Sequence, residues 1–416
     1  MDGTESESLI LIGLSRPRFW TDTGCDNELL FKAVVGQLRG DTYSLLKSNF
    51  SSGQSMGHRN YGRIFLNSNL EISYPVQDFR TEILITGANL PHVMTDLAFI
   101  LGCTEKVLAG RSITFEEAED LLGTDDIMLL ADCANTITRT FNGDTIDVEA
   151  LVNAKSGRCP EDCSFCAQSS FYDTGINKYP LLSTEELVEK AAKAKEDGAT
   201  SFCLVCAYRE PPEKDFQQIC EAIEEIRSKL DIEVNVSLGF MTLDRARALK
   251  KLGVKRYNHN LEAAQSYFPN ICNTHAFSDR VNTAKIVKEA GLQLCSGGII
   301  GMGESPGQRL ELAFSLASLQ PEEVPINILI GREGTPLGSV KPMDPLEAIK
   351  TIAVWRFIMP KTILKIAGGR EVHLKHNDKL ALKAGANGII TGGYLTTGGN
   401  SAKKDIAMIK EIGLKP

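Results

Sequence analysis

From about residue 145 onward, short β-branched runs alternate with helical patterns, and this alternation constrains the fold more than any other feature of the sequence. Runs of this kind predict buried strands. The predicted strands are Asp147–Asn153, Ser201–Cys206, Ile232–Leu238, Arg256–Leu261, Gln293–Ile299, Pro325–Ile330, Ile363–Ala367 and Asn387–Thr391. Eight strand–helix units in about 265 residues predict an α/β fold, a TIM-type (β/α)8 barrel over residues 146–416, with its active site at the carboxyl ends of the strands.

The segments around these strands carry helix signals. Ser183 and Glu186 form a capping box at the start of one helix, and Gly198 stands where that helix should end. Ahead of the barrel, residues 115–122 and 126–140 predict two helices. We expect them to belong to a helical cap over residues 94–145 that closes the amino-terminal face of the barrel.

Composition limits the classes of function. The 416 residues carry a net charge of −8, which argues against nucleic acid or an anionic membrane as a partner. The start, MDGTESESLILIGLSRPRFW, is acidic where a secretory signal would be basic, and no apolar run approaches the ~20 residues that span a bilayer. We therefore expect a cytoplasmic protein, in which the eleven cysteines are thiols or metal ligands rather than disulfides.

Residues 1–93 differ from the rest of the chain. They show no sustained helical or strand period and no motif. We interpret them as an appendage of unknown role, either disordered or the product of a mis-assigned start, and dispensable for chemistry. Met94 begins the stretch that continues into the predicted helices.

The stretch CPEDCSFCAQ follows the first predicted barrel strand and holds Cys159, Cys163 and Cys166. A structural zinc site normally closes with four ligands, and this loop supplies three, so zinc is the less favoured alternative. Three thiolates holding a [4Fe-4S] cluster would leave one iron open to a substrate or cofactor. The loop leaves the carboxyl end of a strand, where barrels of this type do their chemistry.

This CxxxCxxC loop resembles that of the radical S-adenosylmethionine (SAM) superfamily, in which an aromatic residue, here Phe165, precedes the third cysteine. The resemblance implies that the open iron binds the amino and carboxylate groups of SAM. An electron delivered through the cluster would then cleave SAM to methionine and a 5′-deoxyadenosyl radical.

Further stretches narrow the resemblance. They are SGRCPEDCSFCAQSS (156–170), YNHNLE (257–262), CSGGIIGMGE (295–304), VPINILI (324–330) and AGGRE (367–371). In this order they resemble the biotin synthase family, from about Val107 to Leu414. The resemblance implies a sulfurtransferase that inserts sulfur into dethiobiotin in the last step of biotin biosynthesis, a flavodoxin or ferredoxin as electron donor, and a homodimer. Two alternatives stay open: a radical SAM relative with another substrate, such as a maturase or a methyl-transferring enzyme, and a barrel that stores or senses metal.

In YNHNLE, Asn258, Asn260 and Glu262 share strand parity and would face the barrel interior together, whereas His259 would face the helices. Inward amides and a carboxylate are costly to bury without partners, and an internal network with water is the alternative to a ligand. The family resemblance implies that both asparagines contact dethiobiotin or SAM. It also implies that Glu262 contacts the ribose hydroxyls.

Two other stretches gain a role through the same resemblance. Asn327 is a lone polar residue in an apolar strand, which by itself is more often a satisfied core amide. The family resemblance implies that it binds the ureido ring of the substrate. The residues Gly297, Gly298, Ile299 and Gly301 would lie along the adenosyl group, with turn geometry as the alternative reason for the glycines.

The sequence departs from the family at the auxiliary iron-sulfur cluster, which is consumed as the sulfur donor. The best-known members bind this cluster with three cysteines and an arginine. The resemblance aligns Cys203 and Cys295 with two of these cysteines, Asn235 with the third and Lys365 with the arginine. Asparagine is a poor ligand for iron-sulfur clusters, and a lysine must lose its proton before it can bind iron. A hydrogen bond from the Lys365 ammonium to a sulfide is the easier role.

Two more cysteines are candidates to complete the auxiliary site. We expect Cys272 or Cys206 to join Cys203 and Cys295 around a [2Fe-2S] cluster or a variant of it. Regular strand parity turns Cys206 away from Cys203, so Cys206 can join only if its strand ends near Val205. For both cysteines, a small buried core residue is the alternative.

The interpretation of residues 1–93 predicts that a chain beginning at Met94 folds and keeps its activity, because the barrel and its helical cap would be intact. Soluble yield and activity of the truncated chain, measured beside those of the full chain, test this prediction. A truncated chain that fails to fold or to work contradicts it.

Overall fold

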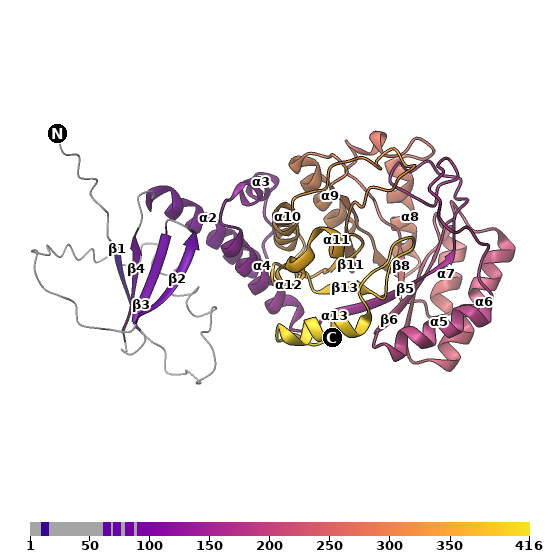
Figure 1. Cartoon of the computed structure of the whole chain (residues 1–416), viewed down its shortest axis with the longest axis horizontal. Helices are drawn as coiled ribbons and strands as arrows, with labels where there is room; N and C mark the ends of the chain where they lie inside the picture. The colour runs from indigo at the N-terminus through magenta and orange to yellow at the C-terminus, as the bar shows by residue number, and fades with distance from the viewer. Residues whose placement is uncertain (1–9, 16–60, 68–69, 76–79, 87–89) are drawn as a thin grey trace, which may run out of the picture.

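A computed structural model describes residues 10–15, 61–67, 70–75, 80–86 and 90–416. Parallel strands close into the barrel that the sequence predicts (Figure 1). Around the ring they are β5 (Asp147–Lys155), β6 (Ser201–Cys206), β7 (Glu233–Ser237), β8 (Arg256–Asn258), β9 (Gln293–Cys295) with β10 (Gly298–Ile300), β11 (Glu323–Ile328), β12 (Ile363–Ile366) and β13 (Gly388–Thr391). Pairing of β13 with β5, and of β11 with both β9 and β10, closes the ring.

Helices connect the strands and surround them (Figure 1). They are α5 (Thr184–Glu196), α6 (Glu213–Lys229), α7 (Leu243–Lys251), α8 (Phe277–Glu289), α9 (Pro306–Leu319), α10 (Pro345–Ile358), α11 (Arg370–His373), α12 (Asp378–Lys383) and α13 (Ala402–Glu411). The predicted capping box begins α5, with Ser183 accepting from the Glu186 amide and the Glu186 carboxylate accepting from the Ser183 amide. Outward-facing strand residues such as Phe202, Leu204 and Val234 pack in the apolar layer beneath the helices.

The predicted strand Gln293–Ile299 is divided in the structure. Ser296 and Gly297 separate β9 from β10, and the break brings the backbone of Gly297 against β11. A Cβ atom at Gly297 would lie 1.9 Å from the carbonyl oxygen of Pro325. Glycine is therefore required for this close approach of the two backbones.

Strand β11 begins two residues before the predicted Pro325. Glu323 lies within β11 and is fully buried, although glutamate is rarely buried without a partner. Its register partners are Cys295 on β9 and Ile363 on β12. A partner inside the barrel, described below, overrides the low strand propensity of glutamate.

The helices ahead of the barrel are α2 (Leu90–Leu108), α3 (Phe115–Gly123) and α4 (Ile127–Asn142), so both predicted helices are present. They pack against α9, α10 and α12, which belong to the outer helical layer. Thr138 on α4 donates to the carbonyl of Gly385, which also accepts from Arg356 on α10. The helices α3 and α4 thus contact the outer helices and the loop before β13, and closure of the amino-terminal face by the helical cap stays a prediction.

Strands occur within residues 1–93, where the sequence analysis predicted none. They are β1 (Ile10–Ser15), β2 (Tyr61–Asn67), β3 (Leu70–Pro75) and β4 (Arg80–Thr86), which form an antiparallel sheet in the order β1-β4-β3-β2. The remaining residues up to 89 lie outside the described part of the chain. The role of this segment remains a prediction.

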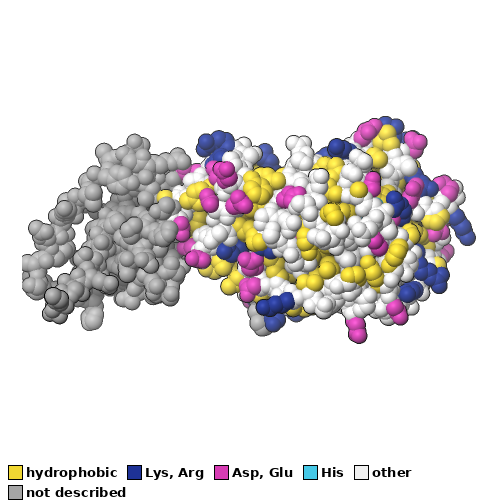
Figure 2. Space-filling model, turned by 90° about the horizontal axis from the view of Figure 1, so that it is seen from above, with side chains coloured by type: hydrophobic (Ala, Val, Ile, Leu, Met, Phe, Trp, Pro, Cys, Tyr) yellow, Lys and Arg dark blue, Asp and Glu magenta, His cyan; other side chains and the backbone are white. Residues whose placement is uncertain are grey.

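One face of the described residues mixes both signs of charge. On the face shown in Figure 2, basic and acidic side chains are interspersed over the barrel. Within the described part of the chain, no helix combines the length and the apolar character needed to cross a bilayer.

Candidate active site

A cavity of about 400 Å³ lies inside the barrel and reaches the loops after the strands. Its lining includes the loop after β5, the residues that follow β8 and the middle of β11. Glu149 on β5 and Glu323 on β11 line it from the barrel interior. The cavity therefore lies where a (β/α)8 barrel places its chemistry.

The CxxxCxxC loop reaches this cavity with all three cysteines. The Ser170 amide donates to the Cys159 carbonyl at 2.8 Å, and the Cys166 amide donates to the Cys163 carbonyl at 2.9 Å, so the loop is held by its own backbone. Phe165 lines the cavity with the three thiols. Burial raises the pKa of Cys159, and that of Cys166 to about 11. Both are neutral thiols at pH 7 and become thiolates when a cation binds.

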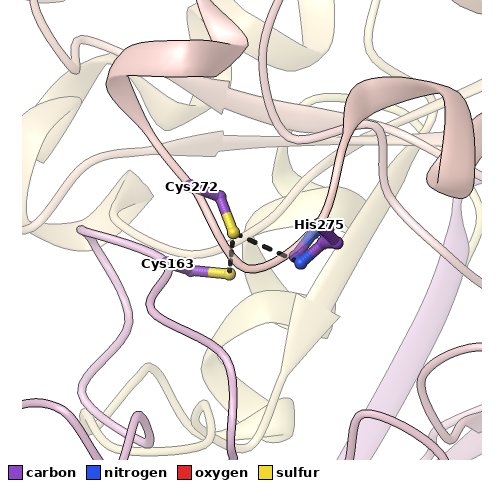
Figure 3. Close-up of side chains that lie close together, drawn as sticks. All are labelled: Cys163, Cys272 and His275. Carbon is purple, nitrogen blue, oxygen red and sulfur yellow. Dashed lines mark hydrogen bonds between the residues drawn. The ribbon is translucent and has the colours of Figure 1, made fainter.

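Cys272 lies directly beside this loop (Figure 3). Its sulfur is 3.9 Å from Cys163 Sγ and 3.2 Å from His275 Nδ1, which is the spacing of a small metal site. The hydrogen bonds of the imidazole argue against such a site. His275 Nε2 accepts from Arg280 Nε at 3.0 Å, so the ring proton is on Nδ1 and is donated to Glu161. A protonated Nδ1 has no lone pair to offer a metal.

The two cysteines expected to complete the auxiliary site have other neighbours. The Cys272 sulfur lies 3.9 Å from the sulfur of Cys163 in the CxxxCxxC loop. Cys206 is the last residue of a strand that continues past Val205. It belongs to the apolar cluster that includes Phe202, and it also lines the cavity. The participation of either cysteine in the auxiliary site stays a prediction.

The residues of YNHNLE line the cavity where β8 ends. Asn258 Nδ2 lies 3.5 Å from Cys203 Sγ, and Asn258 Oδ1 is buried without a hydrogen-bond partner among the described residues. Asn260 Oδ1 accepts from the Gly297 amide at 3.0 Å. Glu262 has a φ of 68°, in the left-handed region, and burial raises its pKa.

His259 corrects the parity argument. It was expected to face the helices, but it also lines the cavity, because β8 ends at Asn258 and strict alternation ends with it. Its ring packs 5.4 Å from the ring of Phe240. Burial holds the pKa of His259 well below its usual range, so the imidazole is neutral at pH 7.

Arg280, near the start of α8, links the cysteine loop to the YNHNLE segment. Its guanidinium donates to the Asn260 carbonyl at 2.9 Å and lies 3.6 Å from Glu262 Oε1. It also lies 3.8 Å from Cys163 Sγ. The sequence analysis did not identify Arg280, because an arginine in the first turns of a helix has no distinguishing pattern.

Asn327 on β11 is engaged at both ends of its amide. Nδ2 donates to the Gly298 carbonyl at 3.2 Å, and Oδ1 accepts from the Gly368 amide at 3.0 Å. Asn327 also lines the cavity, so it keeps one N–H and one lone pair for a ligand.

The glycine-rich segment is explained first by packing. A Cβ atom at Gly298 would lie 2.7 Å from the carbonyl oxygen of Glu262, and Gly301 has a φ of 83°. Gly297, Gly298, Ile299 and Gly301 are outside the cavity lining that the structure describes. Turn and packing geometry therefore suffice to explain the glycines, and their place along the adenosyl group stays a prediction.

Cys203 on β6 and Cys295 on β9 are buried in the barrel interior. Cys295 Sγ donates to Glu323 Oε1 at 3.1 Å. Burial raises the pKa of both thiols well above the usual value, and the charges of Glu149 and Glu323 add to the effect. Both cysteines are neutral thiols in the protein without metal.

Lys365 on β12 is surrounded by carboxylates. Its Nζ lies 2.8 Å from Asp147 Oδ1, 2.7 Å from Glu149 Oε2 and 2.9 Å from Glu323 Oε2. Burial alone would lower the pKa of Lys365, but the three carboxylates hold it well above the usual value. The ammonium keeps its proton and offers no lone pair to iron.

Asn235 on β7 is committed to the same network. Its Nδ2 donates to Glu149 Oε1 at 2.7 Å, and its Oδ1 accepts from the backbone amide of Arg256 at 3.1 Å. The Arg256 guanidinium contacts Asp147 and Glu323, each at 3.2 Å. Two cations and three carboxylates thus fill one layer of the barrel interior.

The comparisons with known proteins first define the class. The profile of the radical SAM superfamily matches residues 154–316, and that of the biotin and thiamin synthesis associated domain matches residues 325–415. A methylornithine synthase structure, 20% identical with a TM-score of 0.68, covers 76% of this chain and 97% of its own. An FeFe-hydrogenase maturase from Carboxydothermus hydrogenoformans, 20% identical with a TM-score of 0.66, covers 76% and 78%. These structures share the fold, and the chain is a radical SAM enzyme.

Curated relatives then define the family. The biotin synthase of Nitrosopumilus maritimus (strain SCM1) is 55% identical over 324 residues, which are 77% of this chain and 99% of the relative. That of Cenarchaeum symbiosum (strain A) is 52% identical over 316 residues, 76% of this chain and 99% of the relative. The chain belongs to the biotin synthase family. The resemblance inferred from the five motifs is therefore confirmed.

Glu149 and Glu323 are interior residues that the sequence analysis missed. Each is a charged residue beside an apolar run, in DVEALV and EEVPINIL. A signal was present for Glu149, because its parity with Leu151 in a predicted buried strand turns it inward. For Glu323 the predicted strand began too late to reveal its parity.

Gly297→Ala should lower the free energy of unfolding by about 3 kcal/mol, because the added methyl group overlaps the Pro325 carbonyl and must displace β11. Chemical denaturation of the purified protein measures the change. Gly307→Ala in α9 is the control, since its Cβ atom would have only contacts at 3.9 Å. Equal stability of both variants would contradict the packing argument.

Proposed function

We propose that this chain inserts sulfur into dethiobiotin, with SAM as the source of the radical and an auxiliary iron-sulfur cluster as the sulfur donor. The amide of Asn258 carries the proposal. Its Nδ2 lies 3.5 Å from Cys203 Sγ, and its buried Oδ1 has no partner among the described residues. A ureido N–H satisfies that oxygen while it holds the substrate next to the sulfur site.

We assign Cys159, Cys163 and Cys166 to the [4Fe-4S] cluster. The three thiols share one cavity, which fits a cluster that needs three thiolates and one open iron. When bound, this cluster supplies the electron that cleaves SAM to the 5′-deoxyadenosyl radical. Phe165 lines the cavity next to these cysteines, and Arg280 contributes a positive charge 3.8 Å from Cys163 Sγ.

We assign Glu262 to the ribose hydroxyls of SAM. Burial raises the pKa of Glu262, and hydroxyl donors would favour its ionised form. Glu262 forms an isolated bridge with Gly298, which supports the placement of the adenosyl group along the backbone of residues 297–301. The Arg280 guanidinium next to Glu262 is suited to bind a carboxylate of a ligand.

Asn260 and Asn327 complete the polar lining proposed for the two small molecules. Each has one amide oxygen that accepts from a backbone N–H, which fixes the orientation of its side chain. Oriented amides can match the alternating donors and acceptor of a ureido ring. A flavodoxin or ferredoxin donor, a homodimer and a cytoplasmic location follow from the family resemblance and stay predictions.

Expression of this chain in a biotin auxotroph that lacks biotin synthase should permit growth on dethiobiotin. The Cys163→Ala variant, which lacks one thiolate of the first cluster, should not support growth. Anaerobic single turnover with dethiobiotin and SAM should yield biotin in vitro. Formation of 5′-deoxyadenosine without biotin would contradict the proposal and favour a radical SAM relative with a different substrate.

Asn258→Ala should raise the KM for dethiobiotin roughly fivefold or more, because a lost buried hydrogen bond costs about 1–3 kcal/mol. The KM for SAM and the rate of 5′-deoxyadenosine formation without substrate should stay unchanged. Steady-state and single-turnover kinetics measure both effects. A variant with unchanged KM for dethiobiotin would remove Asn258 from the substrate site.

A further inference from the structure

The two residues that differ from the expected auxiliary ligands share one neighbour. Asn235 Nδ2 lies 2.7 Å from Glu149 Oε1, and Lys365 Nζ lies 2.7 Å from Glu149 Oε2. Asn235 Oδ1 is occupied by a backbone amide, and Lys365 keeps its proton. Neither residue is available to iron, and both orient the Glu149 carboxylate instead.

Glu323 is also oriented by neighbouring cations, and it contacts the Cys295 thiol. Its Oε2 faces Lys365 and Arg256, at 2.9 Å and 3.2 Å. Its Oε1 accepts the hydrogen bond from the Cys295 thiol at 3.1 Å. When the thiol loses its proton to bind a metal, this hydrogen bond ends and Oε1 is left with free lone pairs directly beside the thiolate.

The three carboxylates of the layer differ in where they face. Glu149 and Glu323 line the cavity, whereas Asp147, which contacts the same two cations, is outside the lining that the structure describes. Two carboxylates are therefore held at the cavity surface, and Glu323 accepts from the Cys295 thiol, which lies behind the lining as Cys203 does. The third serves the ion network alone.

We propose that an iron-sulfur site with mixed ligands lies at this ionic layer of the barrel interior. Its ligands are the thiolates of Cys203 and Cys295 and the carboxylates of Glu149 and Glu323. Lys365 positions both carboxylates and binds no iron. The inference rests on the proposed function, in which the chain holds an auxiliary cluster. Each thiol releases its proton to the solvent as its sulfur binds iron, and no electron is transferred in this step.

The charge of the layer fits a cation. Asp147, Glu149 and Glu323 oppose Lys365 and Arg256, which leaves one negative charge in excess when all five groups are ionised. Iron-sulfur clusters accept ligands other than thiolate, as the histidines of Rieske centres show. The competing explanation is a set of ion pairs that fills the barrel interior and binds no metal. That explanation assigns equal roles to all three carboxylates.

The test compares the full-length wild-type chain with Glu149→Gln, Glu323→Gln and Asp147→Asn after anaerobic reconstitution with 57Fe and sulfide. Iron and sulfide per chain and the Mössbauer spectrum are measured. The wild-type chain should hold the first cluster plus further iron. Both glutamine variants should lose the further iron and keep about four iron atoms per chain in the first cluster. Asp147→Asn should keep both sites.

Glu323→Cys separates ligation from folding. A thiolate at this position should restore the further iron and shift its Mössbauer parameters, whereas loss of a structural ion pair would not be repaired by cysteine. Cleavage of SAM by each variant shows that the barrel and the first cluster are intact. Full iron with an unchanged spectrum in both glutamine variants overturns the proposal, and so does equal loss in Asp147→Asn.

The same samples separate this inference from the proposed function. A wild-type chain that makes biotin but binds no iron beyond the first cluster overturns the mixed ligand set and the auxiliary cluster as sulfur donor, and it leaves the insertion of sulfur into dethiobiotin standing. A wild-type chain that binds the further iron but makes no biotin overturns the function, and the variants still test the ligands.

Discussion

The contact of one buried ammonium with three carboxylates organises the interior of this barrel. Lys365 on β12 reaches Asp147 and Glu149 on β5 and Glu323 on β11, so strands that are not neighbours are joined through their side chains. An unpaired charge at this depth would be very costly, and these close contacts make the burial tolerable. The interior is therefore an ionic layer where (β/α)8 barrels usually have branched apolar side chains.

Because the interior of the barrel is ionic, the hydrophobic stabilisation of the sheet comes mainly from its outer face. The apolar layer between strands and helices is extensive and includes residues such as Phe202, Leu204 and Tyr257. A second apolar cluster continues through α9 and α10 to the helices α3 and α4. The flanking helices thus enlarge the core of the barrel, and the inside of the barrel is left available for polar side chains and a cavity.

The barrel could be predicted because hydrophobic period and turn residues are local signals. The position of the CxxxCxxC loop at the cavity could be predicted because three cysteines at this spacing, directly after a barrel strand, have few other uses. The features that the sequence did not reveal depend on partners that are distant in the chain. Glu323 enters β11 because of Lys365, Cys272 meets Cys163 because two loops fold over each other, and Arg280 gains its contacts only in three dimensions. The strands within residues 1–93 have a period too weak to distinguish them from the loops around them.

Arg280 has a consequence for how the two small molecules are bound. One guanidinium holds the Asn260 carbonyl and lies next to Glu262 and the Cys163 sulfur. Under the proposed assignments, Asn260 contacts the substrate, Glu262 contacts SAM and Cys163 binds the first cluster. A ligand that moves this arginine changes the other binding sites, and thermodynamic linkage makes the effect mutual. Occupancy of either site then alters the affinity of the other by the same factor, so the barrel favours or disfavours the ternary complex as a unit.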